Sequence, residues 1–150
     1  MTPTKPSVPA PPVPLPTPET APYWDAAREG VLRVQRCNSC RRHYFYPRSF
    51  CRYCASSDVE WTAVSGRARL VSYTINHRPL PPFASTSPVI ALVELDEGPR
   101  LMTNIVGVPP LPEHLPLDMR LEVTFEERGE MVLPFFRPEG TAEQKENSTA

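Results

Sequence analysis

Residues 37–54 read CNSCRRHYFYPRSFCRYC and contain all four cysteines of the 150-residue chain. Cys37 and Cys40 form one C-x-x-C pair, and Cys51 and Cys54 form a second pair after a spacer of ten residues. Each pair can direct two thiolates of one tight turn toward the same point, and two such turns supply the four soft ligands of a tetrahedral zinc site. The pattern therefore predicts a zinc ribbon whose metal, with four protein ligands, has a structural role.

Other uses of four cysteines stay open at this point. Iron in the same tetrathiolate cage would make an electron carrier, two disulfides would staple the segment, and one pair alone could act as a redox dithiol. The sequence shows neither the uninterrupted apolar run of a signal peptide nor the roughly 20 apolar residues of a membrane span. We therefore expect a cytoplasmic protein, and in a reducing compartment clustered cysteines favour metal over disulfide.

Proline dominates the start of the chain. The first 22 residues contain nine prolines and only two charged side chains, Lys5 and Glu19. Such a composition lacks the backbone donors and apolar side chains of a packed element. We expect residues 1–21 to form a disordered, proline-rich arm and the polar residues 139–150 to form a flexible tail.

Strand patterns follow the cysteines. In residues 66–77, alternation places Val71, Tyr73 and Ile75 on one face and Leu70 on the other. Further strand segments occupy residues 88–95, 100–108, 119–127 and 131–140. Five strands without a helix-length periodic segment predict a small antiparallel barrel or sandwich.

A short helix is expected ahead of the cysteines. Pro22 can open it and Gly30 can end it, and residues 32–36 then alternate as a strand. Tyr23 and Trp24 lie on this helix, which is too short to bury both residues against a small barrel. We expect these two residues to cap the core or to anchor a partner protein.

Charge is distributed unevenly, although the net charge is only −1. Residues 28–54 contain seven arginines and one acidic residue, whereas residues 91–150 contain twelve acidic and five basic residues. A basic island of this kind indicates either a phosphate-bearing partner or a solvated surface around a compact loop.

Taken together, these segments resemble a family of acyl-CoA-associated proteins, long catalogued as a domain of unknown function. The resemblance runs from about Tyr23 to Pro138 and rests on YWDAAREG, LRVQRCNSC, CRYC, SGRARLVSYTINH, PVIALVELDEGPRLMTNIVG and LPFFRP. It implies a mainly β protein with a short N-terminal helix, a rubredoxin-like zinc ribbon and a five-stranded OB-fold barrel. The helix and ribbon would occupy residues 22–60 and the barrel residues 61–138.

The resemblance also places the zinc ligands of the family on Cys37, Cys40, Cys51 and Cys54. The family often has glycine after each C-x-x-C pair and before Met119, where this chain has Arg41, Ala55 and Asp118. Glycine allows positive φ in such turns, so these turns must either tolerate a Cβ or adopt another geometry.

For function, the resemblance implies a non-catalytic accessory subunit, required by an acyl-CoA enzyme complex in lipid, steroid or related metabolism. Its partner would be a thiolase-like protein, including the lipid-transfer type, or a MaoC-like enoyl-CoA hydratase. We expect arginines to bind the phosphates of acyl-CoA or to face the partner, with aromatic side chains and one histidine beside them. These residues are Arg41, Arg42, Arg48, Arg52, Tyr44, Phe45, Tyr46 and His77, while Tyr23 and Trp24 are expected at the partner interface.

Two other classes of function were weighed. A free-standing enzyme is disfavoured because zinc takes every thiol, and His77 and His114 lack an acid or serine partner within a recognisable motif. The alternative to an accessory subunit is a nucleic-acid-binding protein, since ribbons and OB-folds both serve that purpose. The acidic barrel half argues against it.

Overall fold

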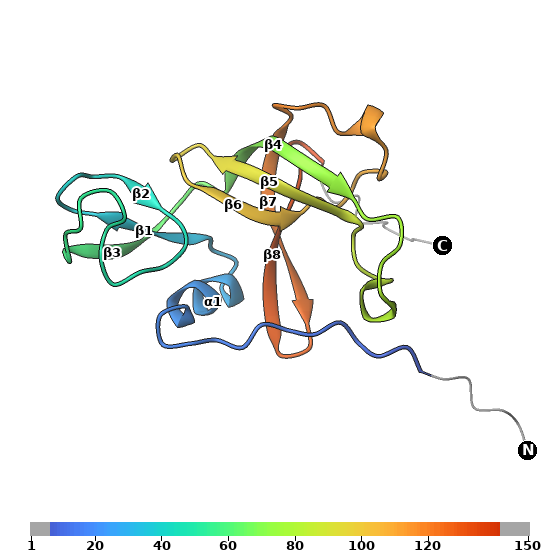
Figure 1. Cartoon of the computed structure of the whole chain (residues 1–150), viewed down its shortest axis with the longest axis horizontal. Coiled ribbons are helices and arrows are strands. Elements are labelled where there is room, and N and C mark those ends of the chain that lie inside the picture. Colours follow the sequence, from blue (N-terminus) through green and yellow to red (C-terminus); the bar gives the residue numbers. More distant parts are fainter. Residues whose placement is uncertain (1–6, 142–150) are drawn as a thin grey trace, which may run out of the picture.

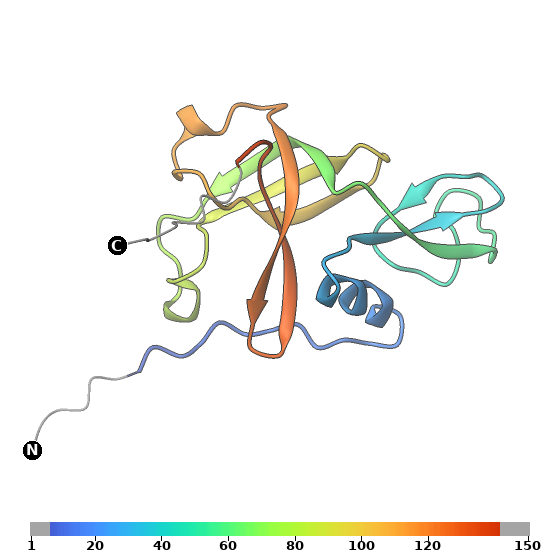
Figure 2. The ribbon, with the colours of Figure 1, turned by 180° about the vertical axis from the view of Figure 1, so that it is seen from behind.

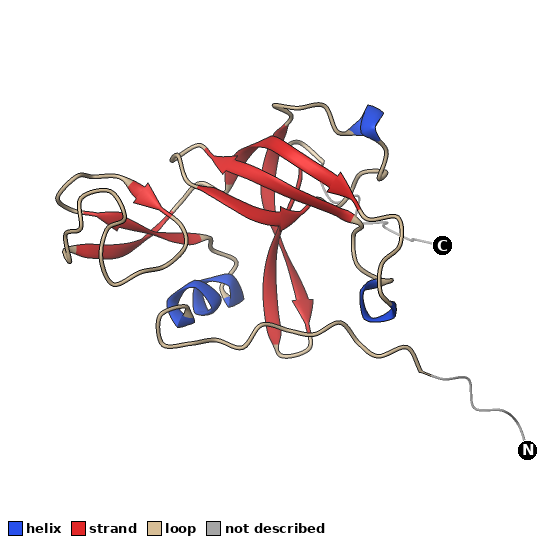
Figure 3. Ribbon diagram, viewed as in Figure 1, coloured by secondary structure: helices blue, strands red, loops and turns tan. Residues whose placement is uncertain are grey.

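The computed structural model describes residues 7–141, so the outer parts of the expected arm and tail, residues 1–6 and 142–150, lie outside the described chain. Strands dominate, as Figure 3 shows. A small three-stranded sheet and a five-stranded barrel lie side by side, and the helix packs beside both (Figures 1 and 2). No helix in residues 7–141 is long and apolar enough to cross a membrane.

Helix α1 spans Ala21–Arg28 and begins at a hydrogen-bonded turn. The backbone N–H of Thr17 donates to the Thr20 hydroxyl at 2.9 Å, and the N–H of Ala21 donates to the Thr17 carbonyl at 2.8 Å. Pro22 lies in the first turn, where the missing N–H costs no helical hydrogen bond. Gly30 follows the helix with a φ of 73°, so it ends the helix as the sequence predicts.

The small sheet contains the cysteine turns. Its central strand β1 (Arg33–Cys37) pairs antiparallel with β2 (His43–Tyr44) on one side and with β3 (Val59–Ala63) on the other. The third strand was not expected from the sequence, and it crosses position 60, where the ribbon was expected to end.

The barrel confirms the five predicted strands. They are ordered β6-β5-β4-β7-β8, and their bounds are β4 Arg67–Ile75, β5 Val89–Leu95, β6 Arg100–Asn104, β7 Arg120–Arg128 and β8 Met131–Pro138. A parallel bridge between Ile105 and Phe136 brings the two outer strands together, so the sheet nearly closes. Two single-turn 3₁₀ helices, η1 (Pro81–Phe83) and η2 (Pro112–His114), lie in the connections.

The alternation expected in the first barrel strand is wrong at one point. Leu70 pairs with Val93, but Ser72 pairs with Leu92, so Val71 is an extra residue in a β-bulge. Beyond the bulge, each side chain therefore points to the face opposite to the one that strict alternation predicts. Leu70 is therefore buried in the same core against which Tyr73 and Ile75 pack, rather than facing the opposite side.

One hydrophobic core joins the helix, the start of the ribbon and the barrel. Tyr23, Leu32 and Val34 belong to the same buried cluster as Leu70 and Phe136. Trp24 packs against this cluster and also against a second one on β8, formed by Met131, Leu133 and Phe135. The ribbon is thus anchored to the barrel by apolar packing.

The described part of the arm crosses the molecule as irregular chain. Residues 7–16 pass the tip of the β7–β8 hairpin (Figures 1 and 2). Pro12, Val13 and Pro14 line a groove together with Trp24 and Phe135. That residues 1–21 form a separate disordered segment stays a prediction.

Candidate metal centre and ribbon surface

The two cysteine turns bring four sulfur atoms to one point. The Sγ atoms of Cys37 and Cys54 are 3.6 Å apart, those of Cys40 and Cys51 are 3.7 Å apart, and all four lie within 4.8 Å of one another. Zinc–sulfur bonds of about 2.3 Å in a tetrahedron place the sulfurs about 3.8 Å apart, whereas a disulfide needs about 2.05 Å. The donor set and its geometry fit one tetrahedral zinc ion held by four thiolates.

Backbone donors lower the pKa of two of the four thiols, Cys37 and Cys51. For Cys54 the bond from the Ser56 backbone lowers the pKa, but burial and hydrogen bonds with the other three sulfurs outweigh it and raise that pKa to about 11. The N–H of Cys40 donates to Cys37 Sγ at 3.5 Å, and this bond is the main reason that the pKa of Cys37 is lowered to about 6. Burial alone would raise the pKa of Cys51, but N–H groups of Tyr53 and Cys54 outweigh it and lower that pKa. Because only the thiolate binds metal, both shifts favour metal binding at neutral pH.

The three turns in which the family often has glycine adopt the left-handed backbone conformation that glycine favours, although this chain has other residues there. Arg41, Ala55 and Asp118 have φ values of 63°, 60° and 65°, all in the left-handed region. The N–H of Ala55 donates to the Cys51 carbonyl at 2.9 Å, which closes the second cysteine turn. Of the two outcomes that the sequence left open, the structure adopts the first: the turn geometry is retained and a Cβ is tolerated.

Two aromatic residues expected at a binding surface are buried instead. Tyr44 is 1% exposed and packs with Cys37 and Cys51, and its hydroxyl donates to the Arg48 carbonyl at 3.3 Å. Tyr23 is 9% exposed, and its ring lies 4.8 Å from that of Trp24 and 5.5 Å from that of Phe45. Their burial makes them core residues in this structure. The half-buried Trp24 retains an accessible surface.

A cluster of exposed aromatic side chains covers one side of the ribbon. Tyr46, Phe50 and Tyr53 are 57%, 49% and 47% exposed. The guanidinium groups of Arg42 and Arg52 lie 4.9 Å and 5.4 Å from the centre of the Tyr53 ring. We call Tyr46, Phe50 and Tyr53 with these arginines the ribbon face. The sequence analysis missed Phe50 and Tyr53, although both are aromatic residues inside or beside a metal turn, where no strand can bury them.

Two concavities adjoin the ribbon face. A shallow one of about 670 Å³ is lined by Phe45, Tyr46, Arg48, Phe50 and residues 51–55. A second, of about 270 Å³, lies between ribbon and barrel and is lined by Phe45, Arg52, Tyr53 and the turn at residues 98–100. The structure thus brings together Arg48, Arg52, Phe45 and Tyr46 of the predicted set. Arg41 lines neither concavity, and His77 lies on the β4–β5 loop, at the other end of the barrel.

Comparisons with known proteins agree with this architecture. Residues 24–60 match the model of the "ChsH2, rubredoxin-like zinc ribbon domain", and residues 61–126 match the "ChsH2, C-terminal OB-fold domain". A chain of the solved Ltp2-ChsH2(DUF35) aldolase is similar to this one, with a TM-score of 0.74 and 34% identity. The match covers 84% of this chain and 98% of that chain.

Curated relatives are similar over part of their length. A probable enoyl-CoA hydratase alpha subunit of Thermomonospora curvata is 35% identical over 117 residues, which is 77% of this chain but 36% of that protein. A DUF35 domain-containing scaffold protein of Methanocaldococcus jannaschii is 33% identical over 92 residues, covering 60% of this chain and 64% of the scaffold. This chain therefore spans about a third of the hydratase subunit.

Proposed function

The chain belongs to the ChsH2 family of zinc-ribbon and OB-fold proteins, and on this premise we propose that it is a non-catalytic accessory subunit of an acyl-CoA enzyme complex. The observation that carries the proposal is the similarity to a chain of the Ltp2-ChsH2(DUF35) aldolase over nearly the whole of that chain. A second relative is named as the alpha subunit of a hydratase. Both names describe parts of larger enzymes. The proposed partner is accordingly a thiolase-like protein of the lipid-transfer type or an enoyl-CoA hydratase.

The ribbon face supports a role in assembly. Tyr, Phe and Arg are enriched in protein interfaces, and exposed aromatic side chains with stacked guanidinium groups are frequent hot spots. Tyr46, Phe50 and Tyr53 are all more than two fifths exposed in the isolated chain, so their rings remain accessible to a partner. We assign the partner to this face, with Trp24 at its margin beside Phe45 and Tyr46.

Binding of acyl-CoA is the finer part of the proposal. None of Arg41, Arg42, Arg48 and Arg52 forms an ion pair with an acidic residue in residues 7–141, so their guanidinium groups are available to phosphate. The gap of about 270 Å³ between ribbon and barrel could receive the thin pantetheine arm past Phe45 and Tyr53. In this assignment the subunit holds the coenzyme while the partner carries out the chemistry.

Assembly can be tested by co-expression with the products of neighbouring genes and mass spectrometry of what co-purifies. We expect a thiolase-like or hydratase-like enzyme in stoichiometric amount. The double variant Phe50→Ala, Tyr53→Ala should weaken the complex by about 2 kcal/mol or more, with zinc content unchanged. Leu117→Ala removes another exposed apolar side chain, 62% accessible and far from the ribbon, and should leave assembly intact. Turnover of acyl-CoA by the purified chain alone would refute the accessory role.

Coenzyme binding needs a separate measurement on the assembled complex. Arg48→Gln with Arg52→Gln should raise KM for the CoA thioester while the complex stays assembled, and Arg33→Gln on strand β1 of the ribbon is the matched control. If the double variant reduces assembly instead, these arginines face protein rather than phosphate. Salt-dependent binding of a single-stranded oligonucleotide would favour the nucleic-acid alternative.

A further inference from the structure

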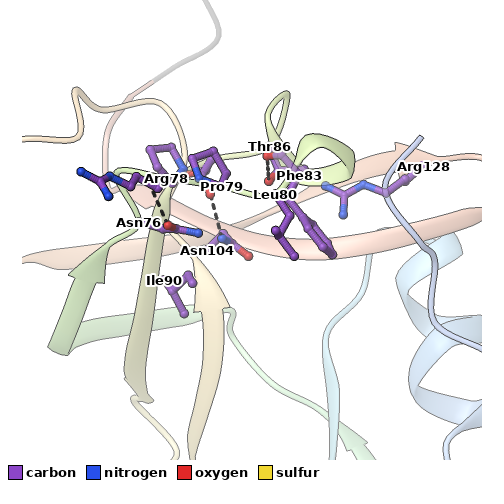
Figure 4. A pocket seen from close by; sticks show the side chains of 11 residues that line it. Asn76, Arg78, Pro79, Leu80, Phe83, Thr86, Ile90, Asn104 and Arg128 are labelled. Carbon is purple, nitrogen blue, oxygen red and sulfur yellow. Dashed lines mark hydrogen bonds between the residues drawn. The ribbon is translucent and has the colours of Figure 1, made fainter. Parts of the chain in front are cut away.

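A separate cavity of about 460 Å³ lies at the end of the barrel away from the ribbon (Figure 4). The β4–β5 loop forms one wall between Asn76 and Pro88, β5 and β6 contribute Ile90 and Asn104, and the β7–β8 hairpin contributes Arg128. Its volume falls in the range of roughly 300–1,000 Å³ that is typical of small-molecule sites.

The walls of the cavity are largely apolar and held in place. Leu80 and Phe83 lie side by side across its centre, and Ile90 lies below them (Figure 4). Within the loop, the N–H of Phe83 donates to the Leu80 carbonyl at 2.8 Å, and the Thr86 hydroxyl donates to the Phe83 carbonyl at 2.8 Å. Leu80 is nevertheless 69% exposed and Phe83 38% exposed. A ligand with a hydrocarbon part would remove this apolar surface from water.

Positive charge flanks these apolar walls. Arg128 points its guanidinium group toward Phe83 and Leu80, whereas the guanidinium group of Arg78, on the opposite side, points away from them, and no acidic residue lines the cavity (Figure 4). Arg128 lies 5.5 Å from the Phe135 ring and has only a long contact of 3.8 Å with Glu126. Arg78 forms no ion pair with any acidic residue in the described chain.

Two side-chain amides complete the polar groups. Asn104 Nδ2 donates to the Ser87 carbonyl at 3.0 Å, which ties β6 to the end of the loop. Asn76 Oδ1 accepts the N–H of Arg78 at 3.1 Å, so the Nδ2 group of Asn76 remains as a donor on the side of Asn104 (Figure 4). Guanidinium and amide N–H groups are donors suited to a planar, singly charged acceptor.

We propose that this cavity binds a medium-chain carboxylate, with its hydrocarbon on Leu80, Phe83 and Ile90 and its carboxylate on Arg128. One guanidinium beside an apolar wall suits a single carboxylate with a hydrocarbon tail better than a polyphosphate, which needs several convergent cations. Arg78 adds long-range attraction from the opposite side. The site is independent of the assembly proposed above, because the two surfaces lie at opposite ends of the molecule.

The test is an amide NMR titration of the zinc-loaded full chain with octanoate, and with octanol as the uncharged probe of equal length. Octanoate should shift the side-chain amides of Asn76 and Asn104 and the backbone of the β4–β5 loop, with about tenfold tighter binding than octanol. Arg128→Gln should lower octanoate affinity to that of octanol, about tenfold. Phe83→Ala should weaken both probes, and Arg67→Gln, an exposed arginine elsewhere on the barrel, should change neither.

Three results would overturn the proposal. The first is the absence of saturable shifts below the micelle concentration of octanoate. The second is equal affinity for the two probes, or octanoate affinity that survives Arg128→Gln. The third is a set of shifts confined to residues outside the cavity. None of these readouts depends on a partner enzyme, so they can fail while the accessory role stands.

Discussion

Ala55 has a φ of 60°, which places its Cβ close to its own backbone carbonyl. For residues other than glycine this conformation costs roughly 1–2 kcal/mol. The hydrogen bond from its N–H to the Cys51 carbonyl ties the conformation to the metal turn. The turn therefore maintains a local strain in order to place Cys51 and Cys54 around one ion.

We predict that Ala55→Gly stabilises the ribbon by about 0.5–1 kcal/mol, because relief of the strain exceeds the added entropy of glycine in the unfolded chain. Thermal unfolding of the zinc-loaded protein measures the effect. Ala63→Gly, at the end of β3, provides the matched control and should lower stability, since no strain is relieved on a strand. A lower melting temperature for Ala55→Gly would contradict the strain argument.

At this scale the sequence predicted the metal ligands. It left open the burial of Tyr23 that the structure shows, and it did not anticipate the burial of Tyr44. Ligand positions follow from spacing within two tight turns, which is a local property. The burial of Tyr23 and Tyr44 depends on which elements cover them: Phe45 and Trp24 pack around Tyr23, and the cysteines pack around Tyr44. The 18 residues from Cys37 to Cys54 carry no signal that separates the buried Tyr44 from the exposed Tyr46.

Ion pairs connect the first three barrel strands on their outer side. Glu94 on β5 accepts hydrogen bonds from Arg100 on β6 at 2.7 Å and from Arg69 on β4 at 2.8 Å, and Arg69 also contacts Asp118. The bond from Arg100, followed by that from Arg69, lowers the pKa of Glu94. The ionised carboxylate therefore joins three strands.

This arrangement predicts a pH dependence of stability. The pKa of Glu94 is lower in the folded than in the unfolded chain, where it is about 4.3, so the unfolded state binds the proton more readily. The contribution of Glu94 is present above about pH 4.3 and is lost as pH falls through the lowered folded value. The melting temperature of the wild type should fall more steeply than that of Glu94→Gln between pH 5 and pH 3. Parallel curves would contradict the prediction, and loss of zinc at low pH affects both proteins equally.

Strands were predictable where apolar and polar residues alternate without interruption, and details were missed where this two-residue alternation is interrupted. All five barrel strands follow from alternation, but the bulge at Val71 is invisible to a strict two-residue period. The strand β3 was missed because its residues Val59–Ala63 were divided between two expected domains. The cavity was missed for another reason: it forms only when the proline-rich loop after β4 packs near Arg128, some 45 residues further along the chain.

On the scale of the whole molecule, ribbon and barrel stabilise each other through β1. Leu32 and Val34 belong to the barrel core, while Cys37 at the end of the same strand binds the metal. The ribbon itself has a very small apolar cluster, so its order depends on the ion. Loss of the zinc ion should therefore lower the stability of the barrel as well as that of the ribbon.

We predict one zinc ion per chain by elemental analysis of protein purified without added metal. Removal by a strong chelator, or the change Cys37→Ser with Cys51→Ser, should disorder β1–β3 and also lower the melting temperature of the barrel by several degrees, because about 1–2 kcal/mol of packing at Leu32 and Val34 is weakened. Amide NMR signals of β5 and β6 report on the barrel separately. An unchanged barrel would show that the two parts are energetically independent, and a red protein would indicate iron.

The packing of α1 on the β7–β8 hairpin also sets an order of events during synthesis. Arg28 of the helix contacts Met131, 103 residues later, and Trp24 packs on Leu133 and Phe135. A ribosome that adds roughly 5–20 residues per second needs on the order of 5–20 s to make the hairpin after the helix has been made. Throughout that interval the part of the helix that packs on β8, including Trp24, is not covered by its native surface, whereas Tyr23 already has Phe45 and the start of β1 beside it. Chaperones that hold nascent chains therefore have a defined window, and a defined segment, on which to act.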